Sequence, residues 1–248
     1  MSPASHNPQG WEESHEQYWD TQAAGYDRLY KSKWSELENR DLKNRLSVLV
    51  PRGSCRILDL GSGTGLGYEL SRQSPNASYI GIDISQEMIG IAKQKWPDAL
   101  FLQQPMHDLS IFADNSFELV ISLFCGFSYE INTSKTVNEI HRVLKSGGTA
   151  FICTLNRWSL RRLIRLSFGA IEVHNTRRAD NSSSVPAHVF SASIIRALFL
   201  EEGFLDVHVS GQGVFSGVVE HPSLWALDNW LVSSTPAIAH MLIVTARK

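Results

Sequence analysis

The sequence predicts a doubly wound α/β fold, in which one largely parallel sheet of seven strands carries helices on both faces. Three observations support this prediction: short apolar segments alternate with helical ones, the first apolar segment runs directly into a glycine-rich loop, and several apolar segments are almost unbroken by polar residues. Unbroken apolar strands are typical of a parallel sheet covered on both faces. We expect the last strand to be antiparallel, in a Rossmann-like arrangement.

The predicted strands and helices follow one another in a regular order. We expect strands at 55–60, 78–83, 99–103, 117–124, 148–155, 204–211 and 237–248. The helices are expected at 66–72, 85–96, 133–145 and 191–203, with a short helix at 222–231. Ser85 is placed to cap the N-terminus of the second of these helices, and Gly147 follows the third as a stop.

Two segments lie outside this alternation. A polar tail at 1–10 precedes a helical pattern from Trp11 to Val50, and a long insertion at 156–189 follows the fifth strand. We therefore expect an N-terminal tail and helical cap at 1–50, and a domain at 51–248 whose insertion forms a lid over the substrate.

Charge and composition exclude several classes of protein. The 248 residues include 23 basic and 25 acidic side chains, which is far from the basic balance of a general nucleic-acid binder. No apolar run approaches the roughly 18–20 residues of a transmembrane helix, and the N-terminus does not resemble a signal peptide. The sequence thus predicts a cytoplasmic protein that is a monomer or a homodimer.

The cysteines predict neither a disulfide framework nor a metal site. Cys55, Cys125 and Cys153 form no C-x-x-C pair, and each stands within an apolar stretch. We expect three buried, reduced thiols and no bound metal.

The glycine loop at 57–65, ILDLGSGTG, is the strongest functional signal. Closely spaced glycines between a strand and a helix let backbone N–H groups approach a ligand. The dinucleotide fingerprint G-x-G-x-x-G would need glycine at position 66, where Leu66 stands. Asp59, two residues before Gly61, suits an amino group better than a pyrophosphate.

A second carboxylate, Asp83, ends the next predicted strand, 22 residues after Gly61. This is the spacing at which an acidic residue binds ribose hydroxyls in doubly wound folds, although such a residue can also simply cap a turn. One acid for an amine and one for a ribose describe S-adenosylmethionine better than the NAD of a dehydrogenase.

Four ordered motifs together resemble the class I S-adenosylmethionine-dependent methyltransferases. They are ILDLGSGTG, GIDIS with Met88 shortly after it, DNSFELVIS, and EIHRVLKSGG followed by TAFICTL. The likeness is greatest to the branch of ubiquinone/menaquinone-type and natural-product small-molecule methyltransferases, and it covers residues 55–155. It implies S-adenosylmethionine as cofactor and S-adenosylhomocysteine as product.

The resemblance also implies which residues bind the cofactor. The methionine part of the cofactor would be lined by the loop residues Gly61, Ser62, Gly63 and Gly65. The ribose would be held by Asp83, and the adenine would pack near Ile84 and Met88. Asp59 and Phe124 are the other residues expected to bind the cofactor. Family members often carry an acid for the adenine amino group after the third strand, but Pro105 occupies that position here. The backbone of Met106, helped by His107 or Asp108, is expected to replace it.

Candidates for catalysis and acceptor binding come from three regions: the N-terminal aromatic segment, the exit of the fourth strand, and the insertion. Tyr26, Phe127, Glu130, His174 and His188 are candidates for positioning the acceptor or acting as a base. Tyr18, Tyr30, Trp34, Tyr129, Asn156, Arg157 and Trp158 are candidates for binding the acceptor. For the aromatic residues, simple core packing is the alternative.

The insertion begins with a basic amphipathic stretch. Arg157, Arg161, Arg162, Arg165, Arg177 and Arg178 face a single acid, Glu172, between positions 156 and 179. A lid helix with a solvated basic face, a site for an anionic or carrier-linked acceptor, and a contact with an acidic protein or membrane surface are all compatible with this pattern.

These observations predict an enzyme that methylates a small or medium-sized organic acceptor at oxygen or nitrogen, in the manner of secondary metabolism. In-line methyl transfer needs mainly correct positioning, so no obligatory catalytic triad is expected. The alternatives are a quinone-type C-methyltransferase and a non-catalytic S-adenosylmethionine-binding partner subunit. Nucleic acid is not expected as a partner.

Overall fold

The sheet of the computed structural model, which describes residues 8–51, 53–71, 77–167 and 185–248, has seven strands within that part of the chain. They are β1 (Cys55–Leu60), β2 (Ala77–Asp83), β3 (Leu100–Gln103), β4 (Phe117–Ser122), β5 (Leu144–Leu155), β6 (Leu205–Gln212) and β7 (Met241–Arg247). Their order is β3-β2-β1-β4-β5-β7-β6, and β7 is antiparallel to both neighbours. The predicted Rossmann-like sheet with an antiparallel last strand is confirmed.

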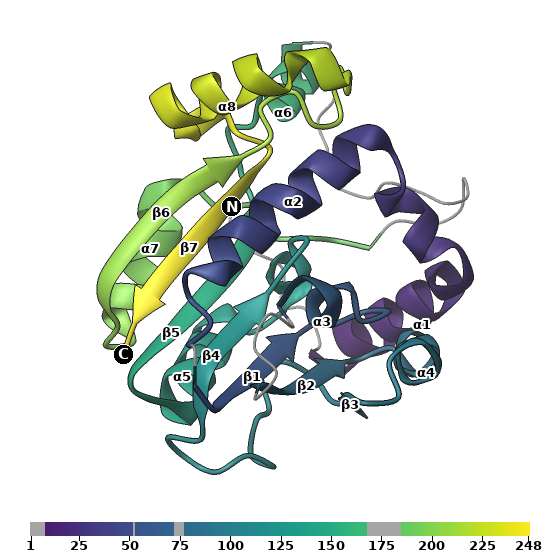
Figure 1. Ribbon diagram of the computed structural model, residues 1–248, viewed down its shortest axis with the longest axis vertical. Coiled ribbons are helices and arrows are strands. Elements are labelled where there is room, and N and C mark those ends of the chain that lie inside the picture. Colours follow the sequence, from purple (N-terminus) through teal and green to yellow (C-terminus); the bar gives the residue numbers. More distant parts are fainter. Residues whose placement is uncertain (1–7, 52, 72–76, 168–184) are drawn as a thin grey trace.

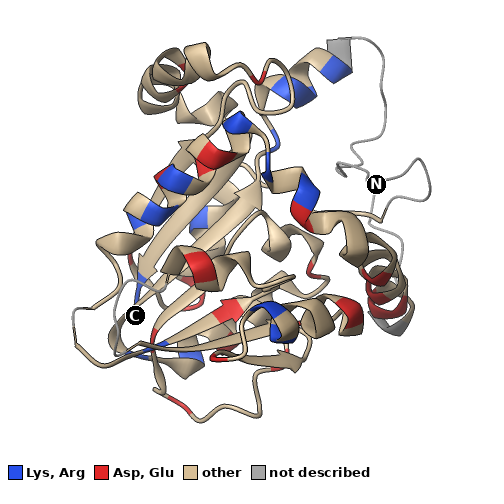
Figure 2. Ribbon diagram, turned by 45° about the vertical axis from the view of Figure 1, so that its right-hand side comes forward, with Lys and Arg blue, Asp and Glu red and all other residues tan. Residues whose placement is uncertain are grey.

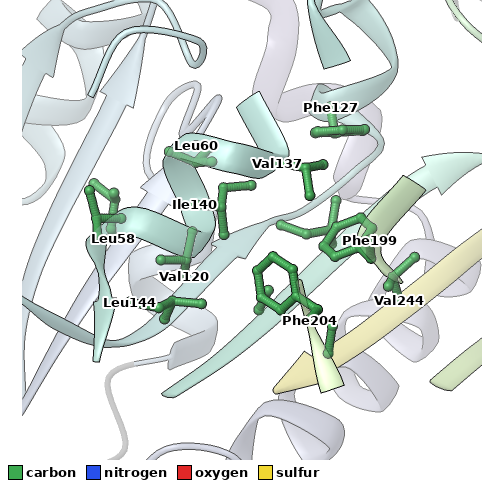
Figure 3. Packing of buried hydrophobic residues seen from close by; sticks show 14 of the residues in the cluster. Leu58, Leu60, Val120, Phe127, Val137, Ile140, Leu144, Phe199, Phe204 and Val244 are labelled. Atoms are coloured by element: carbon green, nitrogen blue, oxygen red, sulfur yellow. The ribbon is translucent and has the colours of Figure 1, made fainter. Parts of the chain in front are cut away.

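Helices cover both faces of the sheet (Figure 1). One face packs against α2 (Lys33–Ser47), α3 (Leu66–Ser71) and α4 (Gln86–Lys95), and the other against α5 (Thr133–Val143) and α7 (Ala192–Glu201). Figure 3 shows the second core, in which Val137 and Ile140 of α5 and Phe199 of α7 meet side chains of the central strands. Burial on both faces explains why these strands read as continuous apolar runs.

Local capping fixes where the helices begin. The Ser85 hydroxyl accepts a hydrogen bond from the Met88 N–H at 3.1 Å, which confirms the predicted cap of α4. Ser32, Asn132 and Ser191 cap α2, α5 and α7 in the same way. Each cap satisfies one of the N–H groups that a helix start leaves without a partner.

The remaining helices lie at the carboxyl end of the parallel strands. These are α1 (Pro8–Tyr26), η1 (Asp27–Tyr30), η2 (Gly126–Tyr129), α6 (Leu160–Ser167), η3 (Pro222–Leu224), α8 (Trp225–Ser234) and η4 (Pro236–Ile238). Figure 1 shows α6 and α8 together beyond the ends of β6 and β7, and Leu160 of α6 packs into the same small apolar cluster as Leu231 and Val232 of α8.

The domain boundaries stay predictions. The helical pattern predicted for 11–50 is present as α1, η1 and α2. Of the predicted lid at 156–189, residues 168–184 lie outside the described part of the chain. The described part of the lid includes α6. Just after the lid, Phe190 pairs with Asn156 in an isolated bridge.

All three cysteines are buried and free, as predicted. Within the residues that the structure describes, no cluster of potential metal ligands occurs, and no helix is long and apolar enough to cross a bilayer. The cytoplasmic location and the oligomeric state stay predictions.

Packing of α2 on the sheet should contribute strongly to stability, because Leu42 is fully buried. We expect Leu42→Ala to lower the free energy of unfolding by about 2–5 kcal/mol, since the substitution leaves a cavity between α2 and the strands. Val48→Ala, at a side chain that is 81% exposed, is the matched control and should change it by less than about 0.5 kcal/mol. Urea denaturation measures both; equal losses would contradict this account of the core.

Candidate functional site

The glycine loop after β1 is held against the end of β2. The N–H groups of Gly61 and Ser62 both donate to the carbonyl oxygen of Ile82, at 2.8 and 2.9 Å. Gly61 has a φ of +70°, and a Cβ added there would lie 2.6 Å from Cε of Met106. Only glycine gives this loop both its left-handed backbone and its closeness to the opposite wall.

Asp83 joins the loop to helix α4. Its Oδ2 accepts from the Gly63 N–H at 2.8 Å, and its Oδ1 accepts from the Ser85 N–H at 2.9 Å. Burial raises the pKa of this carboxyl to about 6, although these bonds oppose the rise. Each oxygen keeps further capacity to accept hydrogen bonds. A half-buried carboxylate with this capacity suits the hydroxyl groups of a ribose.

A cavity of about 890 Å³ lies over the loop. Twelve of the residues predicted for the site line it: Tyr26, Gly61, Ser62, Gly63, Asp83, Ile84, Met88, Met106, His107, Phe124, Tyr129 and Glu130. This volume includes space that is open to solvent. We call it the donor cavity.

Helix α1 covers the donor cavity with Trp11 and His15, which were not among the sequence candidates, and with Trp19 of the N-terminal aromatic segment, which was. Trp11, His15 and Trp19 line the cavity and stand four residues apart, on one face of the helix. The Trp11 indole donates to the Tyr129 carbonyl oxygen at 3.0 Å. The i, i+4, i+8 spacing of these rings in the sequence could have identified one face of a helix that covers the site.

Other lining residues were also missed: Glu12, Thr64, Leu66, Pro105, Leu123 and Ile131. Gly126, at the predicted exit of the fourth strand, lines the cavity too. Thr64 donates its hydroxyl proton to Asp27, which also pairs with Lys95 at 2.8 Å. These contacts tie the segment after α1 to the glycine loop and to α4.

His107 links three elements at one end of the donor cavity. Its Nδ1 lies 3.0 Å from Glu130 Oε1, and its Nε2 lies 3.2 Å from Glu12 Oε1 on α1. The hydrogen bond to Glu130 raises the pKa of His107 above its usual value. Through its two carboxylate partners, His107 binds α1 to the wall of the cavity.

A second cavity of about 760 Å³ adjoins the first. It is lined by Trp19, Tyr26, Leu29, Tyr30, Glu38, Phe124, Cys125, Tyr129, Leu155, Arg161, Ser216, His240 and Met241. Four of these residues, Trp19, Tyr26, Phe124 and Tyr129, also line the donor cavity. We call this group the aromatic partition, and the second space the acceptor cavity.

The aromatic partition is fixed by ring contacts and by an unusual backbone. Trp19 meets Tyr129 edge to face at 5.0 Å, and the hydroxyls of Tyr26 and Tyr30 are 3.0 Å apart. Phe124 and Cys125 both have a positive φ, +52° and +63°. Such angles are rare for bulky residues and occur where surrounding structure holds a functional side chain in place.

Two predicted cofactor residues do not line either cavity. Asp59 is 1% exposed and its Oδ2 accepts from the Tyr79 hydroxyl, behind the loop, because the pleat of β1 turns this side chain towards α3. Gly65 (φ +85°) faces Trp96, the residue directly after α4, and a Cβ on Gly65 would lie 2.5 Å from the indole. Both residues shape the loop from behind.

Tyr18 and Trp34, which were predicted to bind the acceptor, are buried elsewhere. Tyr18 stands behind Trp19, since one residue along a helix turns the side chain by about 100°. The Trp34 indole donates to the Ser216 hydroxyl at 3.1 Å and so fixes a residue of the acceptor cavity. Tyr30 lines that cavity, as expected of an acceptor-binding residue.

The proposed base candidates are dispersed. Phe127 is fully buried in the core (Figure 3), and its ring lies 6.1 Å from that of Phe190. His188 is exposed and stacks on Trp11 at 5.6 Å, outside both cavities. His174 lies outside the described residues.

Of the three predicted acceptor-binding residues at the start of the insertion, one is buried and bound to the backbone and two are exposed. Asn156 is 1% exposed, and its amide nitrogen donates to the carbonyl oxygens of Ala237 and Ala239. Arg157 and Trp158 are exposed, with the guanidinium 5.3 Å from the indole ring. None of the three lines the donor cavity or the acceptor cavity, because they follow the end of β5 and lie beyond the edge of the sheet.

A family model described as "Methyltransferase domain" matches residues 57–148, the segment that runs from β1 into β5. It therefore contains the glycine loop, Asp83 and the exit of β4. The segment 57–148 is therefore a methyltransferase domain of the S-adenosylmethionine-dependent class.

Known proteins resemble this chain in sequence and in fold. A demethylmenaquinone methyltransferase of Chlorobaculum parvum is 37% identical over 97 residues, which are 39% of each chain. The chain spans between 39% and 64% of the length of this and other curated relatives.

Two solved structures share the fold over nearly the whole chain. A possible histamine N-methyltransferase of Thermotoga maritima has a TM-score of 0.65 at 16% identity, over 94% of this chain and 99% of its own. The 1,6-didemethyltoxoflavin-N1-methyltransferase of Burkholderia thailandensis, solved with S-adenosylhomocysteine, has a TM-score of 0.62 at 15% identity, over 100% and 93%.

The donor cavity fits the family's methyl donor, S-adenosylmethionine. Asp83 can accept from the ribose hydroxyls, and Gly61 leaves the space that a Cβ would fill. Ile84 and Met88 supply apolar surface for an adenine, and the Tyr26 ring can attract a sulfonium cation.

The protein should bind S-adenosylhomocysteine more weakly in acid. Asp83, with a pKa of about 6, is ionised at pH 7.5 and protonated at pH 5, and protonation removes acceptor capacity at the ribose. We expect the Kd to rise about tenfold over this interval. Calorimetric titration measures it. Asp83→Asn should bind weakly with a flat pH profile; a flat profile for the wild type would refute the role of the carboxylate.

Asp59 should make stability depend on pH in the opposite sense from a salt-bridged acid. Burial raises its pKa from 3.8 to about 7, so the folded protein holds a proton that the unfolded chain releases. Between about pH 4 and 7 the free energy of unfolding should therefore fall as pH rises, by up to about 1.4 kcal/mol per pH unit. Urea denaturation of Asp59→Asn should lack this part of the slope, and exposed Asp98→Asn should keep it.

Proposed function

We propose that this methyltransferase transfers a methyl group from S-adenosylmethionine to oxygen or nitrogen of a small or medium-sized organic acceptor. The observation that carries the proposal is the pair of adjoining cavities with one aromatic partition between them. The first has the acid and the glycine loop that a nucleoside needs. The second shares four aromatic lining residues with the first, Trp19, Tyr26, Phe124 and Tyr129, and so reaches the donor through them.

On the donor side, the chain's contribution is binding and orientation. Gly61 and Gly63 keep the loop close to the ligand, and the Asp83 carboxylate accepts from the ribose. When bound, S-adenosylmethionine supplies a methyl group on a positively charged sulfur, which a lone pair of the acceptor can displace in line. Correct alignment of two bound reactants is worth roughly 7–11 kcal/mol of barrier.

On the acceptor side, the aromatic partition brings the nucleophile up to the donor. Trp19 and Tyr26 on one side and Phe124 on the other come from α1 and from the exit of β4, so the two cavities meet where these elements meet. Their rings exclude water and favour positive charge. An amine that becomes an ammonium during transfer would gain from this environment.

Carbon methylation is the second candidate. The identity to a demethylmenaquinone methyltransferase, 37% over 97 residues, favours it. The match covers only 39% of each chain, however, so it supports the shared domain more than it supports a particular acceptor, which is why oxygen or nitrogen is preferred here.

The test is a methyl-label assay on extracts of the source organism, with mass spectrometry of the labelled product. We expect a labelled small molecule with the methyl group on oxygen or nitrogen. A methyl group on carbon would establish the second candidate, and a labelled protein or RNA would refute a small acceptor. Binding of S-adenosylhomocysteine without any labelled product would indicate a non-catalytic partner subunit.

A pair of glycine variants controls this assay. Gly61→Val should abolish binding and labelling, because its φ of +70° and the contact with Met106 leave no room for a side chain. Gly90→Ala in α4 should retain both, since a Cβ there meets nothing within 4 Å.

A further inference from the structure

Exposed apolar side chains are concentrated at one end of the molecule, where α6 and α8 lie together (Figure 1). Seven of the thirteen large apolar side chains that are exposed in the described part of the chain belong to the ranges 158–164 and 218–230. Two of them, Trp158 and Trp230, are tryptophans. Isolated apolar residues are ordinary on a protein surface, but a cluster of this kind marks a contact site.

The exposed residues of α6 continue a face that is packed at its beginning. Leu160 lies in the apolar cluster that also holds Leu231 and Val232 of α8. Leu163 and Ile164 stand three and four residues further along α6, on the same face, and both are exposed. The apolar face of this helix therefore extends from the contact with α8 into the solvent.

The loop before α8 and α8 itself enlarge this surface. A Cβ on Gly217 would lie 2.8 Å from Cδ of Arg161, so the loop runs against α6, and Val219 two residues later is exposed. On α8, Leu227 and Trp230 are exposed about one turn apart, on one face of the helix. We call this group the α6–α8 surface, and its apolar members are Trp158, Leu163, Ile164, Val219, Leu227 and Trp230.

The α6–α8 surface carries positive charge. Arg157 and Arg165 are exposed on either side of its α6 residues, and the Arg157 guanidinium lies 5.3 Å from the Trp158 ring. Figure 2 shows the basic residues of α6 at this end of the molecule. On α6, on α8 and in the loop before α8, the described acidic residues are Glu220 and the buried Asp228. The surface therefore favours an anionic partner.

This composition fits the surface of a phospholipid bilayer. Tryptophan side chains concentrate at the boundary between headgroups and acyl chains, arginines pair with anionic headgroups, and leucine and isoleucine reach the acyl chains. A second copy of the chain fits less well, because a two-fold contact through this surface would bring like charges together. An acidic protein would match the charge, but a bilayer also accommodates six apolar side chains from three elements without requiring a shaped partner.

We propose that the α6–α8 surface binds peripherally to a bilayer that contains anionic lipids. Trp158 and Trp230 then lie at the level of the headgroups, and Arg157 and Arg165 pair with lipid headgroups. Because Arg161 of α6 also lines the acceptor cavity, this contact brings that cavity next to the bilayer. The inference goes beyond the proposed function and does not depend on it.

The test is sedimentation of the full chain with vesicles of phosphatidylcholine, alone or with about one-third phosphatidylglycerol. Binding to the mixed vesicles should be at least about tenfold stronger, since each exposed arginine contributes roughly fivefold at an anionic surface. The double variant Arg157→Gln, Arg165→Gln should lose most of this difference. The double variant Lys93→Gln, Arg247→Gln removes the same charge from exposed positions on α4 and β7 and should keep it.

The apolar contribution has its own matched pair. Trp230→Ser should weaken binding to the mixed vesicles about tenfold, because it removes an indole from the headgroup layer. Leu205→Ser changes a side chain that is also 63% exposed, at the end of β6 away from α8 (Figure 1), and should leave binding unchanged. An unaltered Tm shows that each variant is folded.

Several results would overturn the proposal. These are absence of binding to the mixed vesicles, equal binding to both kinds of vesicle, and equal losses in the two double variants. Light scattering that shows a dimer in the wild type and a monomer in Trp230→Ser would assign the surface to a second copy instead. Binding of soluble polyglutamate as tight as that of the mixed vesicles would assign it to an acidic protein.

Discussion

The bond between the Asp83 carboxylate and the Gly63 N–H is the contact on which the donor half of the site depends. Asp83 ends β2 and Gly63 stands in the loop after β1, so one carboxylate sets the distance between two strand ends. The same group accepts from Ser85, which begins α4 and also donates its hydroxyl proton to Asp20 of α1. Strand, loop and two helices therefore take their positions from one residue, and the ribose-binding capacity comes with that arrangement.

The donor half was predictable because its signals are local. A strand, a glycine loop and an acid at a fixed interval lie within one βαβ unit, and the loop geometry follows from the few conformations that Gly61 and Gly63 allow. The wrong assignments in the donor half also have local causes, namely the direction in which a strand or helix turns a single side chain. Asp59 was assigned to the cofactor from its place beside the loop, but the pleat of β1 turns it behind. Tyr18 was preferred to Trp19, although the helix phase set by Trp11 and His15 favours Trp19.

The acceptor half could not be predicted in the same way. Glu38, Arg161, Ser216 and His240 come from α2, from α6, from the segment after β6 and from the residue before β7, and no sequence interval relates them. Their meeting is a product of tertiary packing, in which Trp34 fixes Ser216 and Asn156 fixes Arg162. The sequence analysis named Trp34 and Asn156 as acceptor-binding residues; the structure places both next to groups of the cavity wall and buries them. Solvated arginines were one expectation for α6, and the burial of Arg162 departs from it.

Helix α1 covers the donor cavity and also supplies two rings of the aromatic partition, Trp19 and Tyr26. It is anchored at separate points: Trp11 to the carbonyl of Tyr129, Glu12 to His107, and Asp20 to Ser85. A spent nucleoside leaving past this helix would have to break these contacts together, and the same movement would open the partition to water. A movement of α1 that released the product would therefore also expose the space between the two cavities to solvent. The rate of turnover would then depend on how readily α1 separates from its anchors.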